Sequence, residues 1–489
     1  MSSAAPIRAP DLDPSGIAWL NVNRPLTLSE LRGRLVILDF WTYSNVNCLQ
    51  SLETLRRLED AFPRELVVIG VHSPKFTAER ALESVRHAVL RHRITHPVAH
   101  DPERQLWVRY AVGAWPTLVI ISPDGEVVTE TRGEPDPDQL QALVSQLIEE
   151  HRTRGTLQPT ALDLRHETHE GGAFRFPAKI KPMPGVGQRW AIADAGNHQI
   201  VLLEDDGTET LRFGDGEPGF KDGPAASARF DTPQGLVCST DAIFVADTGN
   251  HAIRRIDVRD RTVKTLAGTG RRGQALGAAR PARQVALASP WDLELDGSQV
   301  FIANAGTHQL GILDLERARL GLLAGNGREA LVDGTAYEAS LAQPSGLVLD
   351  DSGETLYFID SESSSVRALS LDGQRRVTTL CGRGLFEFGH VNGPFTKSLF
   401  QHPLGITWCD GALLISDSYN AIVRRLDLGN AQVADVDDGF VCEDALSLPL
   451  AEPSGVWADG ADRVFVADTN NHRIVELRIR ERRRRTWAG

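Results

Sequence analysis

The sequence predicts two domains of different classes: an α/β domain over residues 1–150 and an all-β, six-bladed propeller over residues 173–489, joined by a linker over residues 151–172. Two patterns carry this prediction. Short apolar strands alternate with amphipathic helices in the first third of the chain, and one strand motif recurs six times in the rest. A chain of 489 residues is also too long for one ordinary hydrophobic core.

The overall charge and the cysteines restrict the classes of function. The formal net charge of −13 disfavours nucleic-acid binding, because phosphates require clustered cations. Five widely spaced cysteines without a C-x-x-C pair are typical of thiols in a reducing compartment. The first ten residues lack the basic and apolar segments of a secretory signal, and the apolar runs are strand-sized rather than membrane-spanning. We therefore expect a cytoplasmic protein without cofactors that contacts neither nucleic acid nor membrane.

Strand and helix patterns in the first domain predict a mixed sheet with helices on both faces. Short apolar or β-rich runs predict strands at residues 35–40, 66–71, 117–121 and 126–132. Amphipathic runs predict helices at residues 47–62, from 77 onward, at 103–110 and at 136–150. The pair Asp124-Gly125 predicts a hairpin between the last two strands, because glycine adopts positive φ freely.

A strand-to-helix turn at residues 39–48, with the sequence DFWTYSNVNC, resembles the active-site turn of thioredoxin-like proteins. Residues 26–34 are similar to the segment that precedes this turn in membrane-tethered thiol reductases and peroxiredoxin-like members. Residues 114–117, AWPT, lie where that fold keeps a cis-proline beside its redox site. The resemblance covers the first 150 residues and implies a site lined by Trp41, Tyr43, Ser44, Asn45, Trp115 and Pro116.

The two positions that would carry redox chemistry are Asn45 and Cys48. In a thioredoxin site the first sulfur lies at the helix start, where unpaired N–H groups and the helix dipole stabilise its thiolate. The second sulfur, three residues later, resolves the mixed disulfide. A carboxamide at Asn45 cannot become a thiolate. Cys48 is therefore either a single-cysteine reductant or peroxidase, or a small buried hydrophobic residue without a redox role.

The aromatic residues of this region have two interpretations. Trp41, Tyr43 and Trp115 could line a peptide groove beside Pro116, or they could pack in the core around the end of the sheet. Core packing is favoured for Trp41.

The linker at residues 151–172 contains glycines and a proline and has little apolar periodicity. Within it, residues 162–164 form one short β-like patch that could dock as an extra propeller strand.

The repeated motif of the second domain is an apolar strand that ends in Ala-Asp or a similar pair, followed by a polar turn and another strand. The residue that ends the strand, here called the marker, is Asp194, Asp247, Asn304, Asp360, Asp417 or Asp468, and markers are 51 to 57 residues apart. A Pro-x-Gly-Leu type segment before five markers predicts the inner strand, and a strand ending in glycine after them predicts the outer strand. Contiguous four-stranded units predict a propeller that closes without strand exchange.

These units resemble NHL repeats, and a thioredoxin-like domain followed by such a propeller resembles the NHL repeat-containing protein 2 family over nearly the whole chain. That family carries a C-C-x-x-C cluster after F-W-T-Y. This sequence keeps F-W-T-Y and the last cysteine, Cys48, but has Ser44 and Asn45 at the other two positions. The resemblance implies the fold, while the departure argues against the family's redox chemistry here.

One face of the propeller should carry both the marker turns and the long connectors between blades, because strands alternate in direction within a blade. Aromatic and cationic residues on connectors favour a protein- or peptide-binding face. The predicted binding residues are Phe220, Lys221, Arg229, Arg271, Arg272, Tyr337, Phe386 and Phe388. Phe230 and Phe400, just before inner strands, are expected to pack between blades.

Three markers are followed by histidine, in the pairs Asp194/His198, Asp247/His251 and Asp468/His472. One pair per blade would spread the ligands around a ring, whereas a metal ion needs converging ligands. An Asp or Asn at this position can instead cap its own turn. We therefore predict no metal.

Three functions follow from these patterns. The favoured one is a cytosolic protein-interaction scaffold, with a protein or peptide partner on the propeller and a degenerate thioredoxin-like domain. The second is a thiol-disulfide oxidoreductase or peroxidase-like enzyme that uses Cys48. The third is a metal-dependent propeller hydrolase or lyase, which needs acids and histidines that converge on the central channel.

Overall fold

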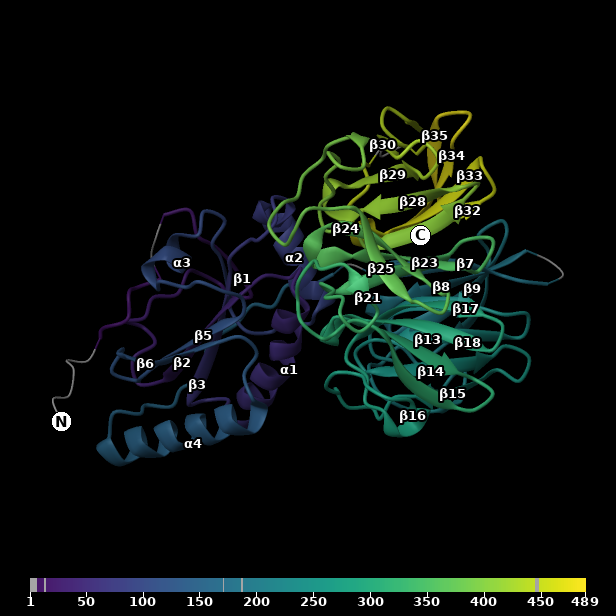
Figure 1. Cartoon of the computed structure of the whole chain (residues 1–489). Coiled ribbons are helices and arrows are strands. Elements are labelled where there is room, and N and C mark those ends of the chain that lie inside the picture. Colours follow the sequence, from purple (N-terminus) through teal and green to yellow (C-terminus); the bar gives the residue numbers. More distant parts are fainter. Residues whose placement is uncertain (1–6, 13–14, 170, 186–187, 445–447) are drawn as a thin grey trace. The chain divides into compact units, whose positions relative to one another are not determined.

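The computed structural model describes residues 7–12, 15–169, 171–185, 188–444 and 448–489. The chain divides into two compact units, Met1–Glu170 and Gly171–Gly489, and Figure 1 shows the elements of each. Each unit has its own hydrophobic cores. The first unit is an α/β domain and the second is a six-bladed propeller, which confirms the predicted fold class.

The first unit is built on a mixed sheet with the strand order β1-β4-β3-β2-β5-β6. Its strands are β1 (Ala18–Leu20), β2 (Leu35–Trp41), β3 (Leu66–His72), β4 (Val98–His100), β5 (Thr117–Ile121) and β6 (Val127–Arg132). Strands β2, β3 and β4 run parallel, and the others join antiparallel. The sequence patterns missed β1 and β4, because three residues are too few to show a period.

Helices cover both faces of this sheet. They are α1 (Val46–Ala61), α2 (Leu82–Arg91), α3 (Gln105–Arg109) and α4 (Pro137–Arg154), with a 3₁₀ turn, η1, at Ala78–Arg80. Because β2 is buried on both faces, its alternate residues enter two different cores. Leu35 and Ile37 pack with α1 and α4, whereas Leu38 and Phe40 pack with α3 and the N-terminal segment.

The helix expected from residue 77 onward is divided. Ala81 has extended backbone dihedrals and separates η1 from α2. Glu79, in η1, turns its carboxylate inward and accepts the backbone N–H groups of Lys75 and Phe76, which fixes the residues just before η1.

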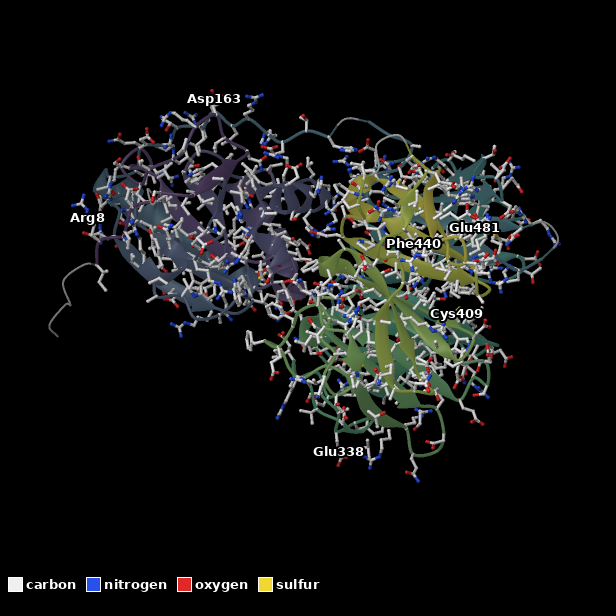
Figure 2. All side chains as sticks on the ribbon, turned by 90° about the horizontal axis from the view of Figure 1, so that it is seen from above. Arg8, Asp163, Glu338, Cys409, Phe440 and Glu481 are labelled. Carbon is white, nitrogen blue, oxygen red and sulfur yellow. The ribbon has the colours of Figure 1, made fainter. Side chains whose placement is uncertain are left out.

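The segment expected to be a linker lies along the first unit. Its first residues complete α4, which ends at Arg154. Beyond it, Leu164 forms a bridge with Val22, and Asp163, which Figure 2 labels, accepts a hydrogen bond from Asn23. The extra propeller strand considered for residues 162–164 is therefore not formed, and the first compact unit extends to Glu170.

The second unit consists of six antiparallel blades. The four main strands of each blade, from inner to outer, are as follows: β7 (Pro177–Met183), β8 (Arg189–Asp194), β9 (Gln199–Glu204) and β10 (Glu209–Phe213) in blade 1; β12 (Pro233–Cys238), β13 (Ala242–Asp247), β14 (Ala252–Asp257) and β15 (Thr262–Ala267) in blade 2; β17 (Pro290–Asp296), β18 (Gln299–Asn304), β19 (Gln309–Asp314) and β20 (Arg319–Ala324) in blade 3; β22 (Pro344–Leu349), β23 (Thr355–Asp360), β24 (Ser365–Ser370) and β25 (Arg376–Cys381) in blade 4; β27 (Gly405–Cys409), β28 (Ala412–Asp417), β29 (Ile422–Asp427) and β30 (Gln432–Asp435) in blade 5; β32 (Pro453–Asp459), β33 (Arg463–Asp468), β34 (Arg473–Arg478) and β35 (Arg483–Ala488) in blade 6.

Connectors add a short outermost strand to blades 2 to 6. These strands are β11 (Gly223–Pro224), β16 (Arg280–Pro281), β21 (Gly334–Thr335), β26 (Gly393–Pro394) and β31 (Val441–Cys442). Single 3₁₀ turns follow five markers, and a sixth lies in the connector between blades 2 and 3: η2 (Ala195–Asn197), η4 (Ala305–Thr307), η5 (Ser361–Ser363), η6 (Ser418–Asn420), η7 (Thr469–Asn471) and η3 (Ala282–Gln284). In the connector before blade 4, Glu338, which Figure 2 labels, accepts a hydrogen bond from Thr335 Oγ1 at 2.7 Å.

The inner strands form a closed ring in the order β7, β12, β17, β22, β27, β32 and back to β7. Glycine in the Pro-x-Gly segments lets neighbouring inner strands approach closely. At Gly455 of blade 6, for example, a Cβ atom would lie 2.6 Å from the carbonyl oxygen of Ala178 in blade 1.

The ring closes between blades 6 and 1 by side-chain packing, since each blade uses contiguous strands. Trp190 of blade 1 packs on Phe465 with ring centroids 4.4 Å apart, and Trp487 packs on Phe465 at 4.8 Å. The Trp487 indole also donates to the carbonyl oxygen of Asp205. The prediction of closure without strand exchange is confirmed.

Within the described residues, no helix combines the length and the apolar character that crossing a bilayer requires.

Candidate functional site

The turn that resembles a thioredoxin site begins where β2 ends. Every residue of β2 is buried, so the strand delivers Trp41 to the carboxyl edge of the sheet in a fixed position. Helix α1 starts five residues later, at Val46, and Asn45 is its N-cap. The sequence therefore positions residues 42–45 as a short turn between a buried strand and a helix start.

Asn45 occupies the backbone donors of this helix start. Its side-chain oxygen Oδ1 accepts the N–H of Asn47 at 2.9 Å and the N–H of Cys48 at 3.3 Å. These are the groups that would stabilise an anion at the N-terminus of a helix. With Asn45 in place, the helix start is capped by a neutral amide.

Cys48 lies in the first turn of α1 and has no exposed surface. All five cysteines of the chain are thiols. A nucleophilic thiol must reach its substrate, and buried cysteines are normally inert. Its place in the first turn of the helix, three residues after Asn45, therefore matches the resolving position of a thioredoxin site.

A buried acid behind the turn was not found from the sequence. Glu79 Oε1 accepts the Thr42 hydroxyl at 2.5 Å and the Ser44 N–H at 3.2 Å, so the carboxyl group fixes the loop that precedes Asn45. Burial raises the pKa of Glu79 to about 7 against the opposing effect of these hydrogen bonds. No motif marked Glu79, because the contact spans 37 residues of sequence.

Two histidines meet at the same edge of the sheet. The Nδ1 atoms of His72 and His100 are 3.3 Å apart, so one ring donates and the other accepts. Burial lowers the pKa of His72 well below its usual value. Trp41 contacts His72 edge-on at 5.2 Å, and Tyr43 stacks on it at 5.4 Å.

The aromatic residues expected to line a peptide groove differ in exposure. Trp41 and Tyr43 are buried, whereas Trp115 is half-buried. The Trp115-Pro116 peptide bond is cis, as the resemblance implied, and the Trp115 indole donates to the carbonyl oxygen of Ser73 at 2.9 Å. The core interpretation thus holds for Trp41, which has no exposed surface.

Asp39 is a second buried acid, in the middle of β2. Neither of its carboxyl oxygens has a hydrogen-bond partner among the described residues. Burial raises the pKa of Asp39 to about 8. A carboxyl group in this state is neutral at physiological pH.

The markers of the propeller hold the connectors. Through its side-chain oxygen, each marker accepts one backbone N–H from the segment just before its own inner strand, at 2.7 to 2.9 Å. The markers that precede the described 3₁₀ turns accept no N–H from the backbone of their own turn. Four markers instead hold that turn by accepting the side-chain amide of the asparagine three residues later, at 2.7 to 2.9 Å: Asp194, Asp247, Asp417 and Asp468. By accepting the backbone N–H described above, the marker also fixes the last residues of the connector just before the inner strand of its own blade.

The histidines after the markers join neighbouring blades. The Nδ1 atoms of His198, His251 and His308 each accept a backbone N–H at the end of the next connector, at 3.0 to 3.1 Å. His472 of blade 6 does the same to Phe176 at the start of blade 1. These histidines therefore have a structural role, including at the closure of the ring. No group of three or more metal-ligating side chains gathers anywhere in the described part of the chain.

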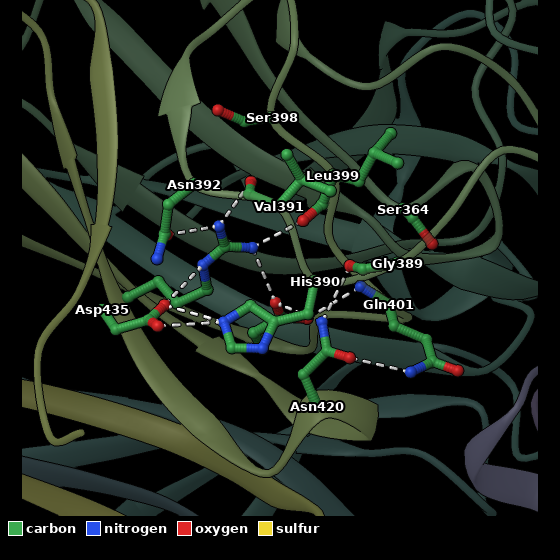
Figure 3. A network of polar contacts seen from close by, with 12 residues as sticks. Ser364, Gly389, His390, Val391, Asn392, Ser398, Leu399, Gln401, Asn420 and Asp435 are labelled. Atoms are coloured by element: carbon green, nitrogen blue, oxygen red, sulfur yellow. Dashed lines mark hydrogen bonds and ion pairs between the residues drawn. The ribbon is translucent and has the colours of Figure 1, made fainter. Parts of the chain in front are cut away.

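Three fully buried arginines extend the marker network into the connectors. Arg254, Arg367 and Arg424 each pair with their marker carboxylate, at 2.6, 2.9 and 3.0 Å. Arg424 donates to the carbonyl oxygens of Val391 and Leu399, two residues that Figure 3 labels. The connectors of blades 2, 4 and 5 are thus folded around a buried cation.

Blade 5 alters this network. Asn392 accepts from Arg424 where Asp222 and Asp333 accept from the arginines of blades 2 and 4. Because Asn392 carries no charge, the second carboxylate beside Arg424 comes from Asp435 in the outer strand. Asp435 also holds the half-exposed His390 at 2.9 Å (Figure 3).

Most of the residues predicted to form a binding face are on the connector surface. Tyr337 and Phe386 are strongly exposed, at 64% and 72%, and Phe220 is 42% exposed, with its ring centroid 5.0 Å from the buried Arg254 guanidinium. Lys221 and Arg271 are exposed, Arg272 and Phe388 are half-buried, and Arg229 pairs with Asp215 at 2.7 Å. Phe230 and Phe400 have no exposed surface and lie in the cores between blades, which confirms that expectation.

Two families match the chain. A family described as thioredoxin-like matches residues 33–127, and the NHL repeat family matches residues 450–477.

Three relatives show how far the similarity extends. NHL repeat-containing protein 2 of Homo sapiens is 35% identical over 94% of this chain and 69% of its own length. Protein SUPPRESSOR OF QUENCHING 1, chloroplastic, of Arabidopsis thaliana is 35% identical over 94% of this chain and 46% of its own length. Protein DipZ of Mycobacterium tuberculosis is 35% identical over 29% of this chain and 20% of its own length.

Proposed function

The chain belongs to the NHL repeat-containing protein 2 family, and we propose that it acts as a protein-interaction scaffold whose thioredoxin-like unit does not cycle disulfides. One observation carries the second half of this proposal. Asn45 stands at the position of the attacking sulfur and uses its own side chain to cap the helix start. Without an ionisable group there, the two-sulfur exchange has no first step.

A single-cysteine reaction of Cys48 is the alternative that a test must separate from this proposal. A lone thiol could form a mixed disulfide with glutathione, but only if its sulfur is accessible and ionised. The complete burial of Cys48 opposes this chemistry.

Support for the interaction role comes from the connectors. Among the described residues of the propeller, all large hydrophobic side chains that are strongly exposed lie in connectors: Phe220, Val332, Tyr337, Phe386, Val391, Val441 and Leu448. Exposed aromatic and aliphatic residues concentrated on one face are typical of protein-binding surfaces. The partner is therefore expected to be a protein or peptide.

The cytoplasm is the compartment that this proposal assigns to the chain. Its support is the chemistry of the five thiols, which are typical of a reducing compartment.

Insulin reduction with dithiothreitol tests the redox half of the proposal. Wild type and Cys48→Ser are expected to show the same background rate. Asn45→Cys restores two sulfurs three residues apart and is expected to raise the rate. A wild-type rate above background that Cys48→Ser removes would overturn the proposal.

Affinity capture from a cell extract of the source organism tests the interaction half. Tyr337→Asp and Phe386→Asp each place a charge on the connector face, and we expect them to lose proteins that wild type retains. The matched control is Glu316→Arg, in the turn between β19 and β20 on the opposite face. Equal capture by all variants would contradict a binding role for this face.

A further inference from the structure

The outer edge of blade 1 differs from the outer edges of the other five blades. In blades 2 to 6, the connector before the inner strand adds a short fifth strand to the outer strand, as β11 does on β15 in blade 2. Blade 1 has four strands among the described residues, and β10 lies at its edge. The outer side of β10 (Glu209–Phe213) is named the open edge below. Such an edge presents backbone N–H and C=O groups with which another strand can pair.

In blades 2, 4 and 5 the segment that covers the outer edge has one sequence pattern. A bulky residue and any second residue precede Asp or Asn, then Gly, then Pro or Thr, at residues 220–224, 331–335 and 390–394. The oxygen of the Asp or Asn side chain accepts an N–H from the buried arginine of its blade at 2.7 to 3.0 Å. The residue before it offers that arginine a carbonyl oxygen. Figure 3 labels both positions in blade 5, Val391 and Asn392.

Blade 1 has a guanidinium in the equivalent environment, although it comes from a different strand. Arg212 of β10 pairs with the marker Asp194 at 3.0 Å, as Arg254 of β14 pairs with the marker of blade 2. Arg212 also donates to the carbonyl oxygen of Ala173, and Arg254 donates to that of Arg229. Ala173 and Arg229 have the same position, four residues before the inner strand of their blades. The receptor for a covering segment is therefore present in blade 1.

The guanidinium of Arg212 is incompletely covered. Its side chain is 24% exposed, whereas Arg254 has no exposed surface. A guanidinium has five N–H donors. Within the described residues, four hydrogen bonds of Arg212 are formed, with Asp194, Gln199, Ala173 and Glu209. One donor is thus left for a further acceptor.

An aromatic contact is also missing in blade 1. Two rings lie over Arg254, with the centroids of Phe220 at 5.0 Å and of Phe230 at 5.1 Å. In the described part of the chain, Arg212 has one such ring, Phe174 at 5.9 Å, which has the position of Phe230. The ring that is absent is the one that the covering segment supplies in blade 2.

The backbone of β10 offers the pairing positions that the covering segment uses elsewhere. Counted back from the glycine that follows each outer strand, Glu209 has the position of Val263, which pairs with Gly223. Leu211 likewise has the position of Thr265, whose N–H donates to the Asp of the covering segment at 3.1 Å.

The part of this chain that precedes blade 1 does not cover the open edge, because it is bound to the first unit. Counted back from the inner strand, Glu167 has the position of Gly223, and it pairs with Arg86 of the first unit at 2.8 Å. Leu164 forms its bridge with Val22. The open edge is therefore left for a segment from outside the chain.

We propose that the open edge binds an extended segment of a partner protein with the pattern aromatic residue, any residue, Asp, Gly and Pro. The Asp carboxylate accepts the remaining N–H of Arg212 and the backbone N–H of Leu211. The aromatic ring packs on the guanidinium, and the Gly-Pro backbone pairs with the start of β10. Strand addition of this kind takes its affinity from main-chain hydrogen bonds and its specificity from the side chains. This surface lies outside the connector residues of the proposed function and goes beyond it.

Fluorescence polarisation with a labelled peptide tests the proposal on the full chain. The peptide has the sequence of residues 219–227, GFKDGPAAS, which covers the edge in blade 2. The matched control peptide carries Asp222→Ala. We expect the Asp peptide to bind about tenfold more tightly, because the control lacks a charge-assisted hydrogen bond. Equal affinities, or no binding of either peptide because the chain's own linker fills the edge in solution, would overturn the proposal.

Variants of the chain locate the binding. Arg212→Met is expected to lose the preference for the Asp peptide, with its melting temperature as the measure of folding. The control Arg259→Met removes an exposed arginine that pairs with Asp241 in blade 2, and it should bind both peptides like wild type. A preference that survives in folded Arg212→Met would contradict the assigned site.

Glu209→Gln tests the same site if Arg212→Met does not fold. The exposed Glu209 carboxylate pairs with Arg212 at 2.8 Å and competes with the carboxylate of the peptide. Its removal should tighten binding of the Asp peptide by about threefold, which is within the range of exposed ion pairs. Unchanged or weaker binding would contradict the proposal.

Two further measurements separate this surface from others. Tyr337→Asp, in the connector before blade 4, is expected to bind the peptide like wild type, so a loss of peptide binding in this variant would contradict the proposal. Sedimentation velocity tests a second copy of the chain as the occupant. A dimer of wild type that Arg212→Met abolishes would assign the open edge to self-association and overturn the assignment to a partner protein.

Discussion

At the scale of the residue, Asn45 stabilises the start of a helix and provides no nucleophile. Its Oδ1 atom accepts two backbone N–H groups and so stabilises the start of α1. A cysteine would leave those donors available to a thiolate. The substitution therefore preserves the helix and removes the nucleophile, and it does so without altering the buried strand that precedes it.

The capping role predicts a local effect. Replacement of a capping Asn by Ala costs about 1 kcal/mol, which is about a fivefold change in an opening equilibrium. We expect Asn45→Ala to accelerate hydrogen exchange in the first turns of α1 by about that factor. Asn45→Ser keeps an acceptor and should remain near wild type. Equal exchange in the two variants would show that the cap is not stabilising.

How far the sequence predicted this site depends on the distance between its parts. The turn at residues 39–48 and the proline at 116 carry local motifs, so Asn45, Cys48 and the cis bond were located from sequence. Glu79 and the His72–His100 pair were missed. They meet the turn only through tertiary contacts, and a lone Glu or His in a sequence has no period or spacing that marks it.

At the scale of the element, the residues of the marker turn connect strands and blades by hydrogen bonds and do not form a set of metal ligands. The marker holds its connector, the following histidine holds the next blade, and in blades 2, 4 and 5 a fully buried arginine holds the connector. The repeat period was visible in the sequence, because the same residues recur. Their hydrogen-bond partners were not visible, since the markers and histidines accept backbone N–H groups, and the arginines donate to backbone carbonyl oxygens, in connectors of variable sequence.

Truncation of a buried arginine is predicted to lower the free energy of unfolding by a large amount. Arg254→Met leaves the Asp247 carboxylate buried and unpaired, and breaking one partner of a buried pair costs about 3–5 kcal/mol. We expect a clear decrease in the urea midpoint of the full chain. The double variant Arg254→Met/Asp247→Asn should recover part of this loss. An exposed control, Arg271→Met, is expected to change the midpoint little. A single variant as stable as this control would contradict the account.

The hydrogen bond that a histidine accepts between neighbouring blades predicts that stability depends on pH. Burial lowers the pKa of His308 from 6.5 to about 4, and its neutral ring accepts the Gln343 N–H. Below pH 6.5, His308 binds a proton in the unfolded chain but stays neutral in the folded chain. The free energy of unfolding therefore falls as pH decreases towards 4. Between pH 6.5 and 5 the loss from this residue is roughly 2 kcal/mol.

His308→Ala tests this dependence through melting temperatures measured from pH 7.5 to pH 5. The variant should be less stable than wild type at pH 7.5, because the Gln343 N–H loses its acceptor, and it should lose less on acidification. Parallel pH profiles for the two proteins would contradict the assignment.

At the scale of the whole molecule, the propeller closes by packing between its first and last blades. Trp487 is two residues from the last residue of the sequence and lies in the same core as Trp190 and Phe465. The sequence indicated six contiguous blades, and from that followed closure without strand exchange. The two charged residues that cross the channel, Lys179 and Asp292, could not be paired from sequence because 113 residues separate them.

Closure by packing predicts the effect of a terminal substitution. Trp487→Ala removes a large aromatic side chain from the seam, which is the packed contact between blades 6 and 1. We expect it to lower the free energy of unfolding by about 3–5 kcal/mol. The control Arg483→Ala, in the same strand, breaks only an exposed pair with Glu443, which is worth about 0–1 kcal/mol. The urea midpoints of both variants measure the difference. Similar small effects would show that the seam does not stabilise the ring.

The claim that the thioredoxin-like unit lacks a reactive sulfur is tested most directly by the alkylation rate of Cys48. Iodoacetamide at pH 7.5 is followed by peptide mass spectrometry, in the native chain and in the chain unfolded by urea. A thiol with no exposed surface should react at least tenfold more slowly in the native chain. A native rate equal to or above the unfolded rate would contradict the account, because only an accessible, activated thiolate reacts so fast.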